Sequence, residues 1–411
     1  MTYQILIIIL LALFSLLAWK NLKIALTLLA GLLPLYLLRF SVGPVPLTVL
    51  EGFIFISFTI WLLKHNGLHA DLRSLKNFLR PLLLLLAAAS FAVVIAPDSI
   101  AALGLWKAYF IEPALVFIML RSVFEKRNDW RNLFAALCAS AIIVSVFAIL
   151  QLETGLGIPV PWDIQLRITG FFDYPNALGL FLSPIVGLAS VLFIKDKKRQ
   201  WLYGATILLS GLTIVHAQTE AALIAIPAGL LVALFVSDTK QKTKHRIIID
   251  AALVLGILIL VFPVILQKVT LQDYSGQARI VQWQETGKLL AKNPAFGAGL
   301  GAYPEAITPF HEEGFYEIFQ YPHNIILNIW SELGILGVIA FIWIAIVCWK
   351  YIRKHNNDPF ALAAFAALAI MTIHGLVDVP YFKNDLAIMT WILIATLSAS
   401  ASKRKSATRS R

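Results

Sequence analysis

Charge is scarce in this chain of 411 residues, of which 14% are charged and 59% are hydrophobic. The mean hydropathy is +0.79. A soluble domain is typically about half apolar and about a quarter charged. Apolar runs recur from one end of the chain to the other, and many approach the roughly 20 residues that a membrane-spanning helix needs. The composition therefore argues against an ordinary soluble domain and predicts an all-α, polytopic integral membrane protein, with residues 1–411 forming a single membrane domain.

The apolar runs predict twelve or thirteen transmembrane helices. The first two runs are short and closely joined, so the sequence leaves the count open, and with it the side on which the N-terminus lies. Thirteen spans place the N-terminus outside the cytoplasm, and twelve place it inside. The expected spans cover residues 3–18, 22–38, 46–63, 81–96, 105–120, 132–152, 174–194, 201–217, 220–236, 247–267, 324–349, 359–377 and 385–400.

Cysteines and nucleotide-binding motifs are also scarce. The two cysteines, Cys138 and Cys348, fall inside apolar spans, so we expect neither a disulfide nor a metal site. The chain has no Walker motif, which argues against an ATP-driven function. The glycine-rich segment 293–305, NPAFGAGLGAYPE, lacks the strand–turn–helix context of a dinucleotide-binding loop. We expect its glycines to permit a tight turn and a close backbone approach.

The basic residues indicate the topology. Of the 34 lysines and arginines, 26 lie in seven clusters on alternate loops, as expected when all seven clusters face the cytoplasm. The net charge of +11 is therefore a topology signal and not a sign of nucleic-acid binding. The basic tail at 402–411 is expected to be a cytoplasmic anchor near anionic lipid. Two polar loops, 153–174 and 268–323, then lie on the extracytoplasmic face. The seven clusters are 20–23, 64–80, 121–131, 195–199, 240–246, 350–354 and 403–411.

Each of the two outer loops carries an arginine. Arg167 precedes the span that begins near Pro175, and Arg279 follows a turn predicted at Gly276. Arginine is the side chain best suited to a planar, bidentate grip on phosphate. The alternative for Arg167 is an ion pair with a nearby aspartate or a lipid contact, and the alternative for Arg279 is a plain surface charge.

His323 stands at the end of the second loop, where an apolar span begins. Pro322 suits the first turn of a helix, which would place His323 at a helix N-terminus near the membrane surface. The positive end of the helix dipole disfavours the imidazolium form, so a neutral imidazole is available to take a proton from an attacking hydroxyl. Asn324 and Asn328 are expected to orient the histidine or to cap the helix. The alternative is a histidine with only a capping or hydrogen-bonding role.

Further candidate substrate-binding residues lie around these three. The segment 279–290 fits a short helix in the membrane interface with Trp283 as its anchor, or a solvated helix packed on the rest of the loop. Asp378 and His374 are four residues apart and are expected on one helical face, where they would line the same cavity as His323. Asn176 lies in the motif that follows Arg167.

Three segments together resemble the O-antigen ligase and polymerase family of bacterial membrane glycosyltransferases in their order, spacing and membrane placement. They are RITGFFDYPNALGLFL, SGQARIVQWQETGKLLAKNPAFGAGLGAYP and YPHNIILNIWSELGILGVIAF. The resemblance implies transfer of a glycan from a polyprenyl (undecaprenyl) diphosphate carrier to an acceptor hydroxyl, on the outer face of the bacterial cytoplasmic (inner) membrane. It implies no metal and no other cofactor. It also implies that Arg167 and Arg279 bind the diphosphate and that His323 is the base.

Two alternatives stay open. A glycan polymerase of the same superfamily uses the same donor and differs in its acceptor. A lipid-linked glycan flippase, or another transporter, belongs to a different class. No convincing internal repeat is present, which weakens the transporter interpretation.

Overall fold

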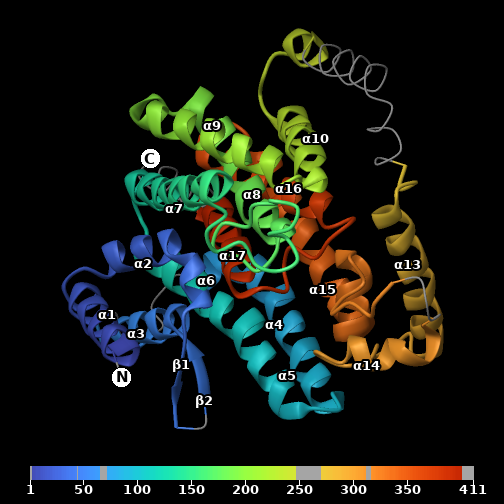
Figure 1. Ribbon diagram of the computed structural model, residues 1–411. Helices are drawn as coiled ribbons and strands as arrows, with labels where there is room; N and C mark the ends of the chain where they lie inside the picture. Colours follow the sequence, from blue (N-terminus) through green and yellow to red (C-terminus); the bar gives the residue numbers. More distant parts are fainter. Residues whose placement is uncertain (1, 44, 65–71, 247–269, 312–315, 400–411) are drawn as a thin grey trace.

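The structure, a computed structural model, describes most of the chain, namely residues 2–43, 45–64, 72–246, 270–311 and 316–399. Helices dominate it, which confirms the predicted all-α, multi-pass membrane fold (Figure 1). Helix is present in each of the twelve expected spans that fall among these residues. The expected span 247–267 and the basic tail 402–411 lie outside the described residues.

The helices run in chain order from the N-terminal hydrophobic helix to the last buried helix. They are α1 (Thr2–Lys20), α2 (Leu22–Gly31), α3 (Val49–Lys64), α4 (Leu72–Ile95), α5 (Ser99–Trp106), α6 (Glu112–Val123), α7 (Arg127–Thr154), α8 (Pro175–Lys195), α9 (Gln200–His216), α10 (Glu220–Val236), α13 (Tyr274–Lys292), α14 (Tyr303–Ile307), α15 (Ile325–His355), α16 (Pro359–His374) and α17 (Asn384–Ala399). Short 3-10 segments cover Leu33–Leu37, Lys197–Arg199 and Thr308–Phe310, and a π segment covers Lys107–Ile111.

Six helical stretches in the described part of the chain are long and apolar enough to cross a membrane. They are Tyr3–Lys20, Leu75–Ile95, Ser99–Val123, Arg127–Thr154, Pro175–Lys195 and Ile325–His355. Four further apolar helices, α2, α10, α16 and α17, are shorter than the usual spanning length.

The expected span 22–38 is helical only in its first part, so this boundary prediction was wrong. Helix α2 ends at Gly31, and a 3-10 turn with Pro34 near its start follows. The chain then forms a hairpin of two antiparallel strands, β1 (Arg39–Val42) and β2 (Val45–Thr48), which the sequence did not indicate. A proline cannot donate the backbone hydrogen bond that a continuing α-helix needs, so the helix yields to a turn here.

Helices α8, α16 and α17 lie at the centre of the bundle, between α7, α9 and α10 on one side and α4 and α15 on the other (Figure 1). Small residues permit the close packing at this centre. Ile370 of α16 occupies the space that Gly187 of α8 and Gly229 of α10 leave open, since a Cβ on either glycine would come within 2.4 Å of its side chain. Small residues at helix contacts are typical of membrane bundles, because they let backbones approach closely.

The glycine-rich segment packs into a break in α15. Gly334 has a φ of 68°, which interrupts the helix, and the freed N–H of Ile335 donates to the carbonyl of Ala295 at 3.0 Å. Gly297 also has a positive φ, and a Cβ there would lie 2.4 Å from the carbonyl oxygen of Ser331. The expected turn and close backbone approach are confirmed.

The loop between α16 and α17, residues 375–383, is held from two sides. Pro113 of α6 has no N–H, so the carbonyl of Tyr109 lacks its usual helical partner. That carbonyl accepts a hydrogen bond from the hydroxyl of Tyr381 at 2.8 Å. At the other end of the loop, the N–H of Ile325 donates to the carbonyl of Gly375 at 2.7 Å. The start of α15 is thereby fixed against the end of α16.

Candidate active site

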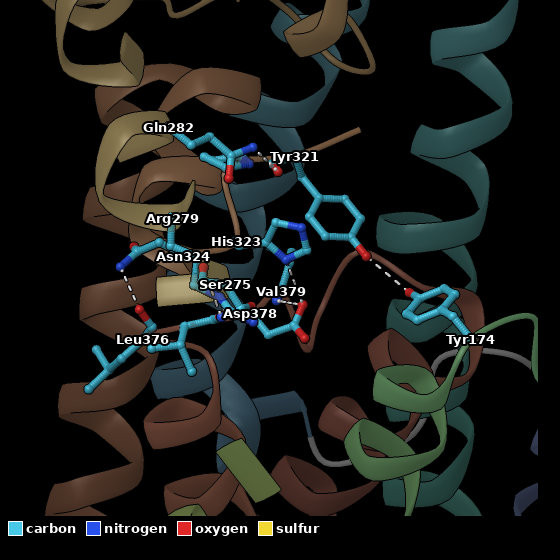
Figure 2. A network of polar contacts seen from close by, with 12 residues as sticks. Tyr174, Ser275, Arg279, Gln282, Tyr321, His323, Asn324, Leu376, Asp378 and Val379 are labelled. Carbon is cyan, nitrogen blue, oxygen red and sulfur yellow. Dashed lines mark hydrogen bonds and ion pairs between the residues drawn. The ribbon is translucent and has the colours of Figure 1, made fainter. Parts of the chain in front are cut away.

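Three segments that are distant in sequence meet at one polar site (Figure 2). They are one face of α13, residues 321–324 before α15, and the loop that follows α16. Figure 2 shows the imidazole of His323 beside the carboxylate of Asp378, with the ring of Tyr321 close to both. The structure therefore brings together most of the residues that the sequence singled out.

His323 is held by α13 through the backbone that precedes it. The side-chain amide of Gln282 donates to the carbonyl of Tyr321 at 2.9 Å, and the indole N–H of Trp283 donates to the carbonyl of Pro322 at 2.9 Å. Two consecutive carbonyls are thus anchored directly before His323, which has a φ of 43°. These contacts show α13 packed on the rest of its loop, which was the second of the two interpretations of this helix.

Asn324 caps α15. Its side-chain oxygen accepts the N–H groups of Ile326 and Leu327, at 3.0 and 3.1 Å, and its amide donates to the carbonyl of Leu376 at 2.9 Å. Asn324 therefore both starts the helix and ties it to the loop after α16. The expectation that Pro322 lies in the first helical turn was wrong, because α15 begins three residues later, at Ile325.

The central contact is between His323 and Asp378. Nδ1 of His323 lies 3.5 Å from Oδ1 of Asp378, which is within ion-pair distance but too long for a good hydrogen bond. The Asp378 side chain is 2% exposed and that of His323 is 18% exposed. Burial raises the pKa of the Asp378 carboxyl, but the His323 ring, the charge of His374 and the N–H of Val379 outweigh it and lower this pKa to about 2. Asp378 is thus a buried carboxylate next to a partly accessible imidazole.

His374 and Asp378 do not share a helical face, so that part of the prediction was wrong. Helix α16 ends at His374, and Asp378 lies in the turn after it, where its carboxylate accepts the N–H of Val379 at 2.8 Å. Gly375 follows His374 directly and ends the helix. Nδ1 of His374 lies 3.3 Å from the hydroxyl of Ser183 on α8. Asp378 nonetheless lies beside His323, as expected.

Arg279 approaches the same loop from α13. Its Nε donates to the carbonyl of Val377 at 3.0 Å, and its Nη1 donates to the hydroxyl of Ser275 at 2.7 Å. The backbone carbonyl of Val377, the residue before Asp378, thus holds the guanidinium of Arg279 in place. The turn expected just before Arg279 lies further back, because α13 already begins at Tyr274. The N–H groups of this helix terminus are therefore a turn away from Arg279.

Aromatic rings connect the site to the first polar loop. The rings of Phe319 and Tyr321 stand edge-on to His323, with centroids 5.0 and 5.1 Å away. The hydroxyl of Tyr321 lies 3.0 Å from that of Tyr174, which is the residue before α8. Burial raises the pKa of both phenols. Asn176 is half-buried in the first turn of α8, two residues after Tyr174.

Arg167 makes its polar contacts with other residues than those around His323 and Asp378. Its Nη2 donates to the carbonyl of Ala217 at 3.1 Å, and its guanidinium lies over the ring of Trp162 with the carbon 5.0 Å from the centroid. Burial lowers the pKa of this guanidinium, and the carboxylate of Glu220 opposes that effect. Its Nε is buried without a hydrogen-bond partner among the described residues. Convergence of Arg167 with Arg279 stays a prediction.

Sequence reasoning gave no role to Lys383, which the structure places near the site. Its ammonium group lies 4.9 Å from the ring centroid of Tyr174 and 5.4 Å from that of Phe172. Burial lowers the pKa of Lys383, and the carboxylates of Asp385, Asp378 and, to a smaller extent, Asp173 oppose this. The only available signal was its position, because Lys383 is one of the eight basic residues outside the clusters predicted to face the cytoplasm.

The fold and this site define a polytopic helical membrane protein with a histidine–aspartate pair at the end of two helices and an arginine beside it. Residues 205–342 match the model of the O-antigen ligase family. A segment of 134 residues is 28% identical to a Rickettsia conorii protein described as a "putative polysaccharide ligase", over 29% of this chain and 33% of that one. The chain thus spans about a third of the length of this relative.

These matches confirm the resemblance to the O-antigen ligase family that the motifs showed. The second and third motifs, with Arg279 and His323, lie inside the matched segment. The first motif, with Arg167 and Asn176, lies before it.

Proposed function

We propose that this protein is a glycosyltransferase of the O-antigen ligase type. It transfers a glycan from a polyprenyl diphosphate carrier to an acceptor hydroxyl on the outer face of the bacterial cytoplasmic membrane. The observation that carries this proposal is the pairing of His323 with the buried Asp378 next to Arg279. The names of the matched family and relative, both ligases, favour this function over a polymerase.

His323 acts as the general base. Because Nδ1 faces the carboxylate of Asp378, the other ring nitrogen, Nε2, is the one that accepts the proton of the acceptor hydroxyl. Asp378 holds the ring and stabilises the imidazolium as it forms, which is the role of the carboxylate in other histidine–carboxylate pairs. The hydroxyl oxygen bonds to the anomeric carbon of the donor glycan as its proton passes to His323.

Arg279 acts on the leaving group. The bond between the anomeric carbon and the diphosphate oxygen breaks, and negative charge builds on the departing polyprenyl diphosphate. A guanidinium already fixed by the carbonyl of Val377 and the hydroxyl of Ser275 stabilises that charge with little reorganisation. The donor carries its own good leaving group, so the reaction draws on no other energy source.

The remaining candidates take supporting roles. Trp283 and Asn324 position the segment of His323 through their hydrogen bonds, in addition to lining the substrate path. Arg167, whose buried Nε has no hydrogen-bond partner in the part of the chain that the structure describes, binds the diphosphate or the first sugar from the side of α8. Asn176 lies on that same side and contacts the glycan.

A gene deletion tests this function. Loss of a ligase leaves long glycan chains that are not attached to their acceptor, as seen when the surface glycan is run on a gel. Single attached repeats would instead show a polymerase. Loss of lipid-linked glycan on the outer leaflet, with transfer intact in permeabilised cells, would show a flippase and contradict the proposal.

A further inference from the structure

A cavity of about 640 Å³ lies at the opposite end of the bundle, among the basic clusters predicted to face the cytoplasm. Its walls come from α2, α7 and α9, and α7 packs against both of the others (Figure 1). Helix α7 has 28 residues and extends from this cavity towards the first polar loop. Such a helix is about 42 Å long, so the cavity is a separate site from that of His323.

The cavity carries one positive charge that no lining carboxylate neutralises. Asp129 is the one carboxylate among the lining residues, and it pairs with Lys23, whose Nζ lies 3.3 Å from Oδ2. Arg199 donates instead to the neutral side chain of Asn132, from Nη2 to Oδ1 at 2.6 Å. The half-buried guanidinium of Arg199 therefore faces the cavity with its charge available to an anion.

Apart from Asn21 and Thr27, the rest of the lining is apolar. Ile24 of α2, Leu202 of α9, Phe124 and Ala135 all line the cavity. Ile24 is exposed on the outside of the bundle, where a membrane helix meets lipid. A cavity that combines an arginine with apolar side chains in its lining fits an amphipathic anion.

Two exposed tryptophans indicate the depth of the cavity in the membrane. Trp19 lies two residues before Asn21, and Trp201 lies two residues after Arg199. They are 53% and 76% exposed. Exposed tryptophans in membrane proteins gather at the level of the lipid headgroups. The cavity therefore opens at headgroup depth.

From these observations we propose that the cavity is a binding site for an anionic phospholipid of the cytoplasmic leaflet. Arg199 holds the lipid phosphate through its planar donors, and the Ile24–Leu202 wall takes the first part of an acyl chain. A lipid bound there joins α2 to α9 across α7. This site goes beyond the proposed transferase activity and does not depend on it.

The test uses the full-length protein, purified in detergent and stripped of lipid. Binding of phosphatidylglycerol and of phosphatidylcholine is followed by native mass spectrometry and by the shift in melting temperature. We expect Arg199→Gln to weaken phosphatidylglycerol binding about five-fold, which is the effect of one basic residue at a membrane surface. Lys197→Gln is the matched control, because Lys197 is exposed on the same short turn and does not line the cavity.

Further variants separate charge from structure. Arg199→Gln removes the charge and also disturbs the hydrogen bond to Asn132. Asn132→Ala removes that hydrogen bond but keeps the charge of Arg199. We therefore expect Asn132→Ala to retain the preference for phosphatidylglycerol. Arg199→Lys is expected to retain part of it. Equal binding of the two lipids, or unchanged binding by Arg199→Gln, would overturn the proposal. Equal stabilisation by glycerol 1-phosphate would show a site for free phosphate and would overturn the lipid assignment.

Discussion

His323 and Asp378 are 55 positions apart in sequence, yet Nδ1 of the imidazole lies 3.5 Å from Oδ1 of the carboxylate. Both residues lie just outside a helix, one before α15 and the other after α16. The two helix ends are joined by the hydrogen bonds from Ile325 to Gly375 and from Asn324 to Leu376. The position of the pair is therefore set by contacts that do not involve the side chain of His323 or that of Asp378.

Replacement of the base is the first prediction. We expect His323→Ala to lower the transfer rate by at least about 100-fold, because general base catalysis contributes roughly 10² to 10⁴. The measurement is single-turnover transfer by purified protein in liposomes that contain the lipid-linked donor and an acceptor. His216→Ala is the control, since His216 is an exposed histidine at the end of α9. Normal transfer by folded His323→Ala protein would rule out the mechanism.

The second prediction concerns the partner of that base. Asp378→Asn keeps the size of the side chain but removes the charge that stabilises the imidazolium. We expect transfer to fall about ten-fold or more, with little change in the apparent affinity for the donor. A lower donor affinity with an unchanged maximal rate would show instead that Asp378 acts in substrate binding.

The same variant makes a pH-dependent prediction for stability. A carboxyl pKa lowered from 3.8 to about 2 on folding corresponds to roughly 2 kcal/mol of stability when the group is ionised. This contribution is fully present above about pH 4 and is lost as the pH falls through about 2. The difference in unfolding free energy between wild type and Asp378→Asn should therefore shrink as the pH falls from about 4 to 2. A difference that stayed the same over that range would contradict this assignment.

How much of this arrangement the sequence could predict differs from residue to residue. The spans followed from hydrophobicity, because a bilayer demands long apolar helices with few exceptions. His323 and Arg279 stood out as polar groups at the margins of apolar runs. The end of helix α2 at Gly31 was missed because residues 32–38 are as apolar as a membrane-spanning helix. Pro34 was the one residue in that stretch that indicated a turn.

The pairings were harder to predict than the residues. Periodicity placed Asp378 on the same helix as His374, whereas the helix ends between them at Gly375 and the loop redirects the carboxylate. Trp283 was predicted to be a membrane anchor because indole is amphipathic, but its N–H donates a hydrogen bond to the carbonyl of Pro322. Such choices depend on which partner the tertiary fold brings near, and a single sequence does not carry that information.

The third prediction tests the grip on the diphosphate. Arg279 uses Nε for the carbonyl of Val377 and Nη1 for Ser275, a geometry that a single ammonium group cannot reproduce. We expect Arg279→Lys to lower transfer by about ten-fold or more, and Arg279→Ala to lower it further. Lys292→Gln, at the exposed end of the same helix, is the control. If Arg279→Lys were as active as wild type, transfer would not depend on the two-point hydrogen bonding of the guanidinium at this position.

The last prediction decides whether Arg167 belongs to the site or to the scaffold. Its bond to the carbonyl of Ala217 and its stacking on Trp162 suit a structural role. Its buried Nε, which has no hydrogen-bond partner among the residues that the structure covers, suits a ligand instead. If Arg167 binds the donor, Arg167→Lys should raise the apparent KM for the lipid diphosphate by about ten-fold while the melting temperature changes little. Trp162→Leu, which removes the stacking partner alone, should leave that KM nearly unchanged. A large drop in melting temperature for Arg167→Lys with an unaltered KM would assign Arg167 to the packing of the first loop on α9, and the diphosphate would then rest on Arg279 without it.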